Sequence, residues 1–380
     1  MSSHRETLPT RLATGKSGPL HGVRVIEMAG IGPAPFCGMM LADLGADVVR
    51  IDRPGPPRFG ANTVLDRGRQ AVTLDLKNER NVEALLCLVE KADVIFEGFR
   101  PGVMERIGAG PEACLARNPR VIFGRVTGWG QEGPLAHAAG HDINYLALSG
   151  MLWPMGSADR PPSPPLNLVA DFGGGGMMLA VGILAALLEA TSSGRGQVVD
   201  AAMVDGAAAL GAMIFGMIGS GSWRAEREAN VLDGGAPFYG VYETSDGKWV
   251  SIGSIEPQFY AQLLARLDLE GRGFDAQWDQ RKWPALRQAI AAAFRSKSRD
   301  AWSEQLEGTD VCFAPVLSPL EAGAHPHNRM RGTFANAQGA YQPQPSPRFG
   351  RTPASAGPVT EAGDEDAETV LIRWRSQSSA

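Results

Sequence analysis

Residues 23–52 read VRVIEMAGIGPAPFCGMMLADLGADVVRID, and this stretch decides the predicted fold. An apolar run at Val23–Met28 is followed by a glycine turn, by a helical pattern over Pro33–Leu44 and by a second apolar run at Asp47–Asp52. Two short buried strands joined by a helix form a βαβ unit, in which the strands are parallel and the crossover is right-handed. The stretch therefore predicts the start of a parallel sheet covered by helices.

The alternation of strands and helices continues to about residue 126. We expect further strands at 71–75, 93–97 and 120–125, separated by helices at 79–91 and 103–117. A chain that alternates in this way forms a mostly parallel sheet with helices on its faces. The sequence therefore predicts an α/β fold with a large, doubly wound (Rossmann-like) parallel-sheet domain.

The remainder of the chain indicates a second domain. A hairpin centred on Asp246-Gly247, a pair that favours type I′ turns, precedes helices and an apolar strand at 311–317. This is the pattern of a smaller α+β domain, and 380 residues are enough for two domains. We expect a disordered N-terminal extension at 1–18, the large domain at 19–200 and 330–380, a linker helix at 201–229 and the small domain at 230–329.

Composition argues against several functional classes. The net charge of −5 argues against nucleic-acid binding. The apolar runs 176–188 and 206–219 are shorter than the ~18–20 residues of a spanning helix, so we expect no membrane segment. His325-Pro326-His327 has no partner cluster, so we expect no metal site. The four cysteines form no CxxC pair, which predicts buried thiols in a reducing compartment and a cytoplasmic protein.

One stretch combines an acid, a glycine block and an apolar helical run. Asp171 and Phe172 precede the four glycines of 173–176. This order predicts a helix that begins near Asp171, with the carboxylate as its N-cap. The backbone N–H groups of Phe172, Gly173 and Gly174 would then be free in the first turn, where glycines let another molecule approach closely. A capped helix with a loose first turn and no catalytic role would explain the same pattern.

The carboxyl ends of the predicted strands carry cations. Ligands of doubly wound sheets bind at this edge. The turn after the first strand lacks the third glycine of GxGxxG, so a dinucleotide fingerprint is weak, although Asp52 keeps a nicotinamide dinucleotide as a minor alternative. Basic side chains at the strand ends favour the phosphates of a ligand; these are Arg53, Lys77, Arg100 and Arg106.

Four longer motifs are more specific. They are Gly140-His141-Asp142-Ile143-Asn144-Tyr145, Asn167-Leu168-Val169 with Asp171-Phe172-Gly173-Gly174-Gly175, the run GRGQVVDA at 194–201 and the run IEPQF at 255–259. Together they resemble the α-methylacyl-CoA racemases of the family III CoA-transferase superfamily. The resemblance extends from about residue 20 to about residue 352.

The resemblance implies specific roles. In this family the residues that match His141 and Asp171 are the acid/base pair, and the residue that matches Glu256 assists from the small domain. An acyl-CoA thioester is implied as the substrate, with no separate cofactor, in an interlocked homodimer whose active site is shared between subunits. The positions that match the CoA-ester contacts are Arg53, Leu74, Asp75, Leu76, Lys77, Gly98, Phe99, Arg100, Arg106, Gly140, Asp142, Ile143, Asn144 and Tyr145.

The chemistry of inversion agrees with two acid/base groups. Inverting a carbon next to a thioester requires that one group removes its proton and that another returns a proton to the opposite face. Histidine side chains titrate near pH ~6.5 in model peptides, and burial can raise a carboxylate toward that value. The enolate between the two steps needs hydrogen-bond donors, which free N–H groups after Asp171 could supply.

Two other functions stay open. A CoA-transferase on the same fold would use Asp171 as a nucleophile. His141 favours inversion over transfer, because transfer needs no second base. A non-catalytic acyl-CoA-binding protein is the other alternative, and the presence of His141, Asp171 and Glu256 together argues against it.

Overall fold

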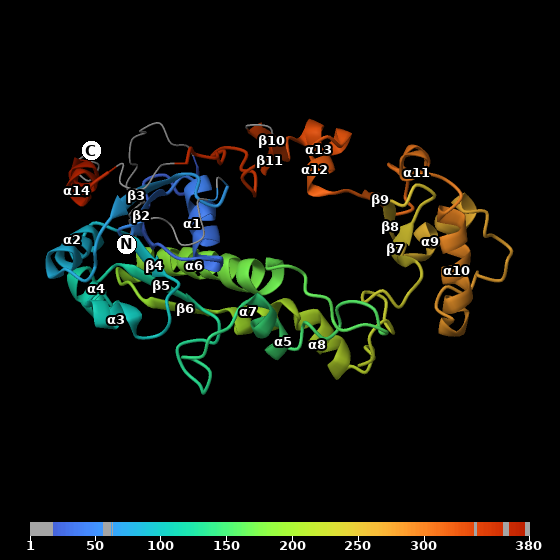
Figure 1. The fold of residues 1–380 in the computed structure, drawn as a ribbon, viewed down its shortest axis with the longest axis horizontal. Helices are drawn as coiled ribbons and strands as arrows, with labels where there is room; N and C mark the ends of the chain where they lie inside the picture. Colours follow the sequence, from blue (N-terminus) through green and yellow to red (C-terminus); the bar gives the residue numbers. More distant parts are fainter. Residues whose placement is uncertain (1–17, 56–61, 63, 338–339, 360–364, 377–380) are drawn as a thin grey trace, which may run out of the picture. The chain divides into compact units, whose positions relative to one another are not determined.

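The computed structural model describes residues 18–55, 62, 64–337, 340–359 and 365–376, which form two compact units (Figure 1). The large unit takes the described residues of 1–151, 165–212 and 344–380, and the small unit takes those of 152–164 and 213–343. These boundaries differ from the predicted ones: 201–212 belongs to the large unit, and 152–164 and 330–343 belong to the small unit. Of the extension predicted at 1–18, only Gly18 lies within the described residues.

The large unit is built on a six-stranded parallel sheet with strand order β3-β2-β1-β4-β5-β6. This order confirms the predicted Rossmann-like α/β sheet, because the chain winds outward from β1 in both directions. Strands β1, β4 and β5 are buried at every position, as expected for parallel strands covered on both faces. The strands are β1 Arg24–Met28, β2 Asp47–Asp52, β3 Arg69–Thr73, β4 Val94–Glu97, β5 Ile122–Thr127 and β6 Val198–Ala202.

Helices cover both faces of this sheet. One face packs on α2 (Glu79–Val89), α3 (Val103–Ile107) and α4 (Pro111–Arg117), and the other face packs on α1 (Pro33–Asp43) and α6 (Met178–Ser193). The helix predicted at 103–117 is two helices, because Gly108 takes a left-handed conformation (φ 88°) that ends α3.

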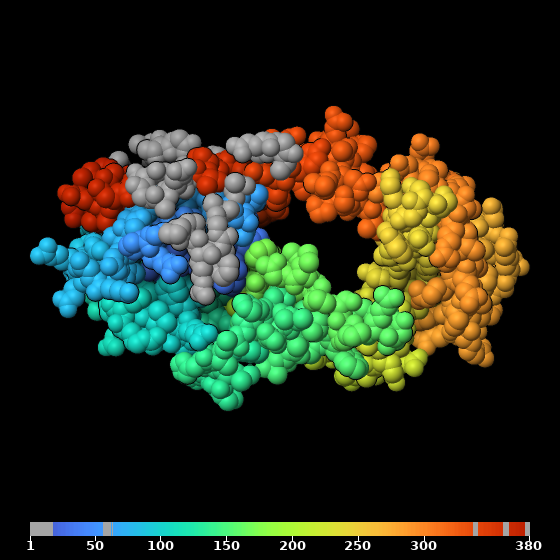
Figure 2. Space-filling view, viewed as in Figure 1, coloured from blue at the N-terminus to red at the C-terminus, as the bar shows by residue number. Residues whose placement is uncertain are grey.

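The C-terminal segment completes the large unit. Helix α14 (Ala367–Ser376) packs on α2, and Trp374 is fully buried in the core of the sheet. The indole Nε1–H of Trp374 donates to Asp47 Oδ2 at the start of β2, at 2.8 Å. Figure 2 shows this red segment against the blue N-terminal part of the same unit. The end of the chain is therefore a structural layer of the large unit.

The glycine-rich stretch lies within one continuous helix. Leu168–Met177 is a π-helix, which continues directly into α6, so the whole helix runs from Leu168 to Ser193. At 26 residues, with a mean hydropathy of 1.7 over its most apolar window, this helix is long and apolar enough to cross a membrane. That is weak evidence, because core helices share these properties. We expected no membrane segment because the apolar run at 176–188 was too short to span a membrane, but the helix that contains this run is longer than expected.

The predicted linker helix is interrupted. Helices α7 (Met203–Leu210) and α8 (Ala212–Gly219) meet at Gly211, where a β-carbon would lie 2.2 Å from the sulfur of Met151. Helix α8 has no buried residue within the chain, although its sequence is strongly apolar.

The small unit combines two antiparallel sheets with short helices. Strands β7, β8 and β9 form one sheet, and β10 and β11 form a hairpin. The helices α9, α10 and α11 supply most of its core. The elements are β7 Tyr239–Glu243, β8 Trp249–Gly253, α9 Pro257–Arg266, the short 3₁₀ helix Gln280–Lys282, α10 Trp283–Phe294, α11 Arg299–Leu306, β9 Phe313–Val316, α12 Pro319–Ala322, α13 Pro326–Arg331, β10 Phe334–Ala337 and β11 Ala340–Pro343.

The β7–β8 hairpin does not use the predicted type I′ turn. Thr244 N–H donates to the Lys248 carbonyl, which closes a three-residue loop, and Gly247 has a positive φ of 70° while Asp246 does not. A type I turn followed by one left-handed glycine produces this geometry. The Asp-Gly signal correctly indicated a hairpin, but it indicated the wrong turn.

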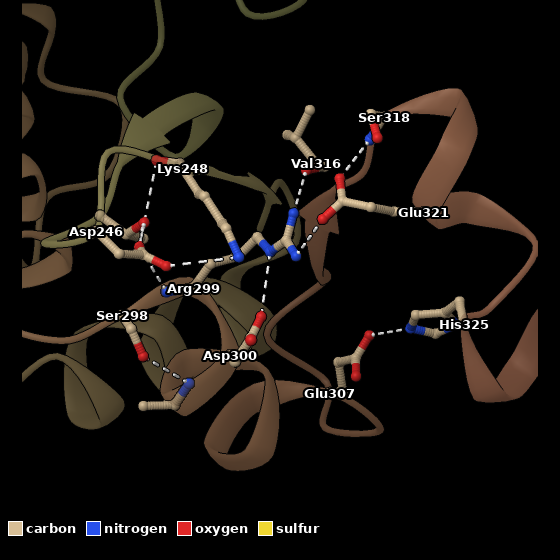
Figure 3. Close-up of polar contacts among 12 residues, drawn as sticks. Asp246, Lys248, Ser298, Arg299, Asp300, Glu307, Val316, Ser318, Glu321 and His325 are labelled. Carbon is tan, nitrogen blue, oxygen red and sulfur yellow. Dashed lines mark hydrogen bonds and ion pairs between the residues drawn. The ribbon is translucent and has the colours of Figure 1, made fainter.

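Polar contacts around Arg299 hold the small unit together (Figure 3). Its guanidinium donates to the Val316 carbonyl at 3.2 Å and pairs with Glu321 at 2.8 Å. This pairing and hydrogen bonds with Ser318 lower the pKa of Glu321 to about 2. Nearby, His325 contacts Glu307 at 2.8 Å, and within the described residues no acid, histidine or cysteine group could hold a metal ion.

Candidate active site

The carboxyl ends of β1 and β4 form the start of the site. The strand order reverses between these two strands, and ligands of doubly wound sheets bind in the crevice at such a switch point. The residue after β4 lies against the first turn of α1, since a β-carbon on Gly98 would be 3.2 Å from Cβ of Ala34. Gly32, with φ 68°, ends the first loop and precedes α1.

Asp171 reaches this crevice from the π-helix. A β-carbon on Gly32 would lie 3.1 Å from Asp171 Oδ2, so the carboxylate lies directly against the loop after β1. The prediction that Asp171 caps a helix start is wrong, because the π-helix begins three residues earlier with Asn167 as its N-cap. π-helical turns are rare in proteins, and those that occur often lie at functional sites.

The surroundings of Asp171 favour its protonated form. Burial raises the pKa of Asp171 from 3.8 to about 6, and the negative charge of Asp142 adds to this effect. A hydrogen bond from Asn167 and the nearby imidazole of His141 act in the opposite direction. A carboxyl group with this pKa is mostly ionised at pH 7 and can still accept and release a proton near neutrality.

His141 is placed by the helix that it precedes. It is the exposed N-cap of α5 (Asp142–Leu148), and its backbone N–H donates to Asn144 Oδ1 at 3.0 Å. The next residue, Asp142, accepts hydrogen bonds from the backbone of Ala170 and Asp171. The structure therefore brings the two predicted acid/base residues together, although they are thirty positions apart.

The four glycines allow two helices to pack closely on the π-helix. On one side, a β-carbon on Gly174 would lie 2.7 Å from the backbone nitrogen of Ala207 in α7. On the other side, a β-carbon on Gly176 would lie 2.7 Å from the carbonyl oxygen of Pro33 in α1. Residues without a side chain are required at both contacts. The glycine block therefore has a packing role, and the close approach of another molecule to it stays a prediction.

The prediction that the backbone N–H of Phe172 is free to bind the enolate is also wrong. Its N–H donates to the Asn167 carbonyl, and its ring stacks on Phe36 of α1 with centroids 4.5 Å apart. Gly173 and Gly174 lie inside the same π-helix, where N–H groups bond to carbonyls five residues earlier. The actual helix start lies at Asn167, so these three N–H groups are not first-turn donors.

Replacing Gly206 with Ala will test this packing. In most helices the change stabilises by up to about 1 kcal/mol, but here the added methyl would lie 1.9 Å from the Gly174 carbonyl oxygen. We expect a loss of about 1–3 kcal/mol in the free energy of unfolding, measured by urea denaturation, and reduced activity because the π-helix must shift. Ala209→Ser, at an exposed position of the same helix, should change stability by about 0.5 kcal/mol or less. Equal effects of the two changes would contradict the packing role.

Tyr145 packs against the loops that precede α5. It is buried against Gly128 and Gly140, where β-carbons would lie 2.1 Å and 2.7 Å from its ring, and its ring meets Trp129 edge-on at 4.7 Å. Burial, followed by the charge of Asp171, raises the pKa of Tyr145 to about 12. Of the motif GHDINY, only His141, Ile143 and Asn144 have exposed side chains.

The predicted phosphate-binding cations lie at the strand ends. Arg53 follows β2, Lys77 follows β3, and Arg100 follows β4; all are exposed, as is Arg106 in α3. None of the four forms an ion pair with another residue in the described ranges. Asp52, in contrast, pairs with Arg50 at 2.9 Å and is not a free ribose-binding acid.

Other predicted contacts shape these loops. Leu74 is buried, and Leu76 and Phe99 pack partly against the core of the large unit. Asp75 Oδ1 accepts the N–H of Lys77 at 3.2 Å. These residues lie in or beside the loops that carry the cations, and their role as CoA contacts stays a prediction.

Sequence reasoning missed a buried ion network beneath the Gly98–Arg100 turn. Glu97, at the end of β4, accepts hydrogen bonds from Phe99 N–H at 2.5 Å and from Arg125 Nε at 2.9 Å. Arg125 also pairs with Glu105 of α3 at 2.8 Å. Burial raises the pKa of Glu97, against the opposing effect of these partners. The sequence signal for this network was the presence of Glu97 and Arg125 within the otherwise apolar strands β4 and β5.

Glu256 belongs to the small unit. It is the exposed N-cap of α9, at the end of the segment Ser254-Ile255-Glu256. The buried Gln277 side chain donates to the carbonyls of Ser254 and Ile255, at 3.1 and 2.8 Å. The sequence analysis did not identify Gln277. Its two hydrogen bonds fix the segment that ends at Glu256.

The fold and the site define a class: an α/β protein with a carboxylate at the switch crevice of a Rossmann-like sheet and a histidine whose charge acts on that carboxylate. The sequence model of CoA-transferase family III matches residues 20–360, and the chain belongs to this family.

Sequence relatives narrow the comparison. The chain is 48% identical to "Alpha-methylacyl-CoA racemase" of Mus musculus over 92% of both chains. It is 45% identical to the human protein of the same name, over 88% of this chain and 87% of the relative. It is also 30% identical to "Succinyl-CoA--L-malate CoA-transferase beta subunit" of Chloroflexus aurantiacus, over 93% of both.

Solved structures share the fold. A CAIB/BAIF family protein from Brucella suis superposes with a TM-score of 0.80 at 24% identity, covering 94% of this chain and all of that one. A hypothetical protein from Mycobacterium tuberculosis gives a TM-score of 0.77 at 27% identity, over 93% of this chain and 99% of that one.

Proposed function

We propose that this chain is an isomerase that inverts the 2-methyl stereocentre of branched acyl-CoA thioesters. The observation that carries the proposal is the position of Asp171 at the switch crevice, with His141 of another element close enough for its charge to act on Asp171. The names of the relatives at 45–48% identity support the same reaction and substrate class.

The reaction follows from the two groups. Ionised Asp171 removes the α-proton of one epimer, and the electron pair of the broken C–H bond moves into an enolate. Protonated His141 then gives a proton to the other face of the same carbon. In the opposite direction, neutral His141 is the base and protonated Asp171 is the acid. No redox step occurs, and the proton count balances in each direction.

The enolate oxygen needs donors other than those predicted. The N–H groups of Asp142 and Ile143 open α5, directly after His141, and donate to no acceptor among the described residues. First-turn N–H groups have no partner within their own helix. We assign the stabilisation of the enolate to these two groups, which is worth a few kcal/mol for one donor in comparable sites.

The exposed cations at the strand ends hold the phosphates of CoA. Within the part of the chain that the structure describes, Arg53, Lys77, Arg100 and Arg106 form no ion pairs, so their charges are available for a polyanionic ligand. CoA is part of the substrate, and the proposal includes no separate cofactor.

The test uses a single epimer of a 2-methylacyl-CoA in deuterated water. We expect the two epimers to reach equilibrium while one deuterium is incorporated at the α-carbon. Chiral chromatography detects the epimerisation, and mass spectrometry detects the deuterium. Transfer of CoA to added succinate without α-exchange would establish a CoA-transferase that uses Asp171 as nucleophile. Binding with neither reaction would indicate a carrier.

The proposal also includes a homodimer that shares its active sites. In the chain itself, α8 exposes Met213, Phe215 and Ile218 to about half of their surface, and an apolar face of this kind marks an interaction site. Glu256, in the small unit of one copy, would then assist the pair in the large unit of the other.

Mixing two inactive variants tests this sharing. Asp171→Asn and Glu256→Gln each impair every site of a homodimer. After co-refolding, a mixed dimer contains one intact site only if the site combines residues of two subunits. We therefore expect regained epimerisation. A mixture as inactive as its components, with dimers present by light scattering, would exclude the shared site.

A further inference from the structure

Asp142 connects the two elements that carry the acid/base pair. It directly follows His141 and is only 5% exposed. Its Oδ2 accepts hydrogen bonds from two consecutive residues of the π-helix, Ala170 N–H at 2.9 Å and Asp171 N–H at 2.7 Å. One carboxylate oxygen therefore ties the backbone of the catalytic acid to the residue next to the catalytic histidine.

This carboxylate replaces the missing intrahelical partners of the π-helix start. The first N–H groups of a helix have no carbonyl to bond to, and Asn167 makes no side-chain cap. A capping side chain normally comes from the helix itself. Here it comes from α5, so the start of the π-helix is fixed relative to α5 and not only relative to its own sequence.

The second carboxylate oxygen of Asp142 bears on the electrostatic effect of this residue on Asp171. Oδ1 is also buried and accepts no hydrogen bond from any residue that the structure describes. Little solvent reaches this carboxylate, so its charge is poorly screened from neighbouring groups. That charge acts on the neighbouring Asp171 carboxyl.

Among the described residues, Asp142 is the anion whose charge acts on Asp171. The polar groups that face Asp171 are the imidazole of His141, the amide of Asn167 and the buried phenol of Tyr145. The helices that pack on the π-helix contribute no charge at the contact: α1 presents Gly32, Pro33 and Phe36, and α7 presents Met203, Gly206, Ala207 and Leu210.

We propose that the side chain of Asp142 is a positioning group of the acid/base pair and not a contact of the CoA ester: its carboxylate fixes Asp171 relative to His141 and places a buried negative charge beside it. The inference rests on the proposed function, in which Asp171 must act as a base toward one epimer and as an acid toward the other. It assigns to Asp142 a different role from the one that the family resemblance implied.

Two substitutions separate the two effects. Asp142→Asn keeps an oxygen that can accept both backbone hydrogen bonds, but it removes the charge. The ionised form of Asp171 then persists to lower pH, because a neighbouring negative charge no longer opposes it. Asp142→Ala removes the acceptor as well and leaves two N–H groups of the π-helix without their partner. Asp205→Asn, an exposed acid in the first turn of α7, is the matched control.

The measurement is the pH profile of kcat/KM for the epimer whose α-proton Asp171 removes. With Asp142→Asn we expect the acidic limb to move to lower pH by about half a unit or more, while KM for the CoA ester stays within about twofold. With Asp142→Ala we expect kcat to fall about 100-fold with KM little changed, since misplacement by about 1 Å can have this effect. With Asp205→Asn both the limb and KM should match those of the unchanged protein.

Contrary outcomes are equally specific. An unchanged acidic limb in Asp142→Asn would overturn the electrostatic role. A large rise in KM with kcat unchanged, in either variant, would restore Asp142 as a CoA contact and overturn the inference.

A direct titration keeps this test separate from the proposed function. Carbon-13 NMR of protein labelled at aspartate carboxyls, with the Asp171 signal assigned by its loss in Asp171→Asn, reports the protonation of Asp171 without any turnover. A signal that titrates at lower pH in Asp142→Asn supports the inference even if the unchanged protein does not exchange α-protons. An unmoved titration overturns it even if the protein is an active isomerase.

Discussion

His141→Ala will lower the rate of epimerisation by about 10²–10⁴-fold, with the affinity for the CoA ester largely retained. The reason is that inversion needs two groups at one carbon, whereas we propose that cations at the strand ends hold the CoA portion. Asp171→Asn will have an effect of similar size. Each loss is measured as kcat for single epimers, and the retained affinity is measured by calorimetry with the thioester.

A sharper result is expected when His141→Ala is incubated with each epimer in deuterated water. The epimer whose α-proton faces Asp171 should still exchange slowly and keep its configuration, because Asp171 removes the proton and returns a deuteron to the same face. The other epimer should not exchange. His137→Ala, at another exposed histidine before α5, is the matched control and should leave both reactions unchanged. Loss of folding in His141→Ala, seen by circular dichroism, would instead assign His141 a structural role.

Trp374→Ala should have the largest effect on stability. The indole is fully buried between α14 and the core of the large unit, and it donates a hydrogen bond to Asp47. Truncating a buried tryptophan costs about 3–5 kcal/mol, because apolar contacts are lost and a cavity remains. The loss should appear in the urea unfolding of the large unit and as faster hydrogen exchange in α14 and β2.

A second residue of the same helix provides the control for Trp374. Ile372 is 60% exposed, so Ile372→Ala should change stability by about 0.5 kcal/mol or less. Similar losses for the two substitutions would show that α14 contributes through helix formation and not through the burial of its tryptophan.

The sheet could be predicted because its signals are local. The runs at Arg24–Met28 and Asp47–Asp52 are short and apolar, and a helical period separates them, so the strands and their parallel order follow. Element ends were less predictable. Gly108 and Gly211 divide predicted helices because of a backbone conformation in one case and a contact with Met151 in the other.

The site was predictable as a set of residues but not as an arrangement. The motifs around His141 and Asp171 indicated both side chains, and the structure brings them together. The helix start at Asp171 was wrong because an acid followed by glycines is a signal for an N-cap, and here a carboxylate from another helix provides the cap instead.

The sequence by itself determined a Rossmann-like parallel sheet and the cations at its strand ends, and it indicated the two residues that we propose as the acid/base pair. Only the tertiary structure decided why glycines are needed here: at Gly174 and Gly176 a side chain would collide with the backbones of α7 and α1, and at Gly175 it would collide with the side chains of Met203 and Pro33. It also decided the role of Asp142, because a hydrogen bond across 29 positions leaves no local pattern. Contacts of this kind depend on how elements pack, and packing depends on the whole chain.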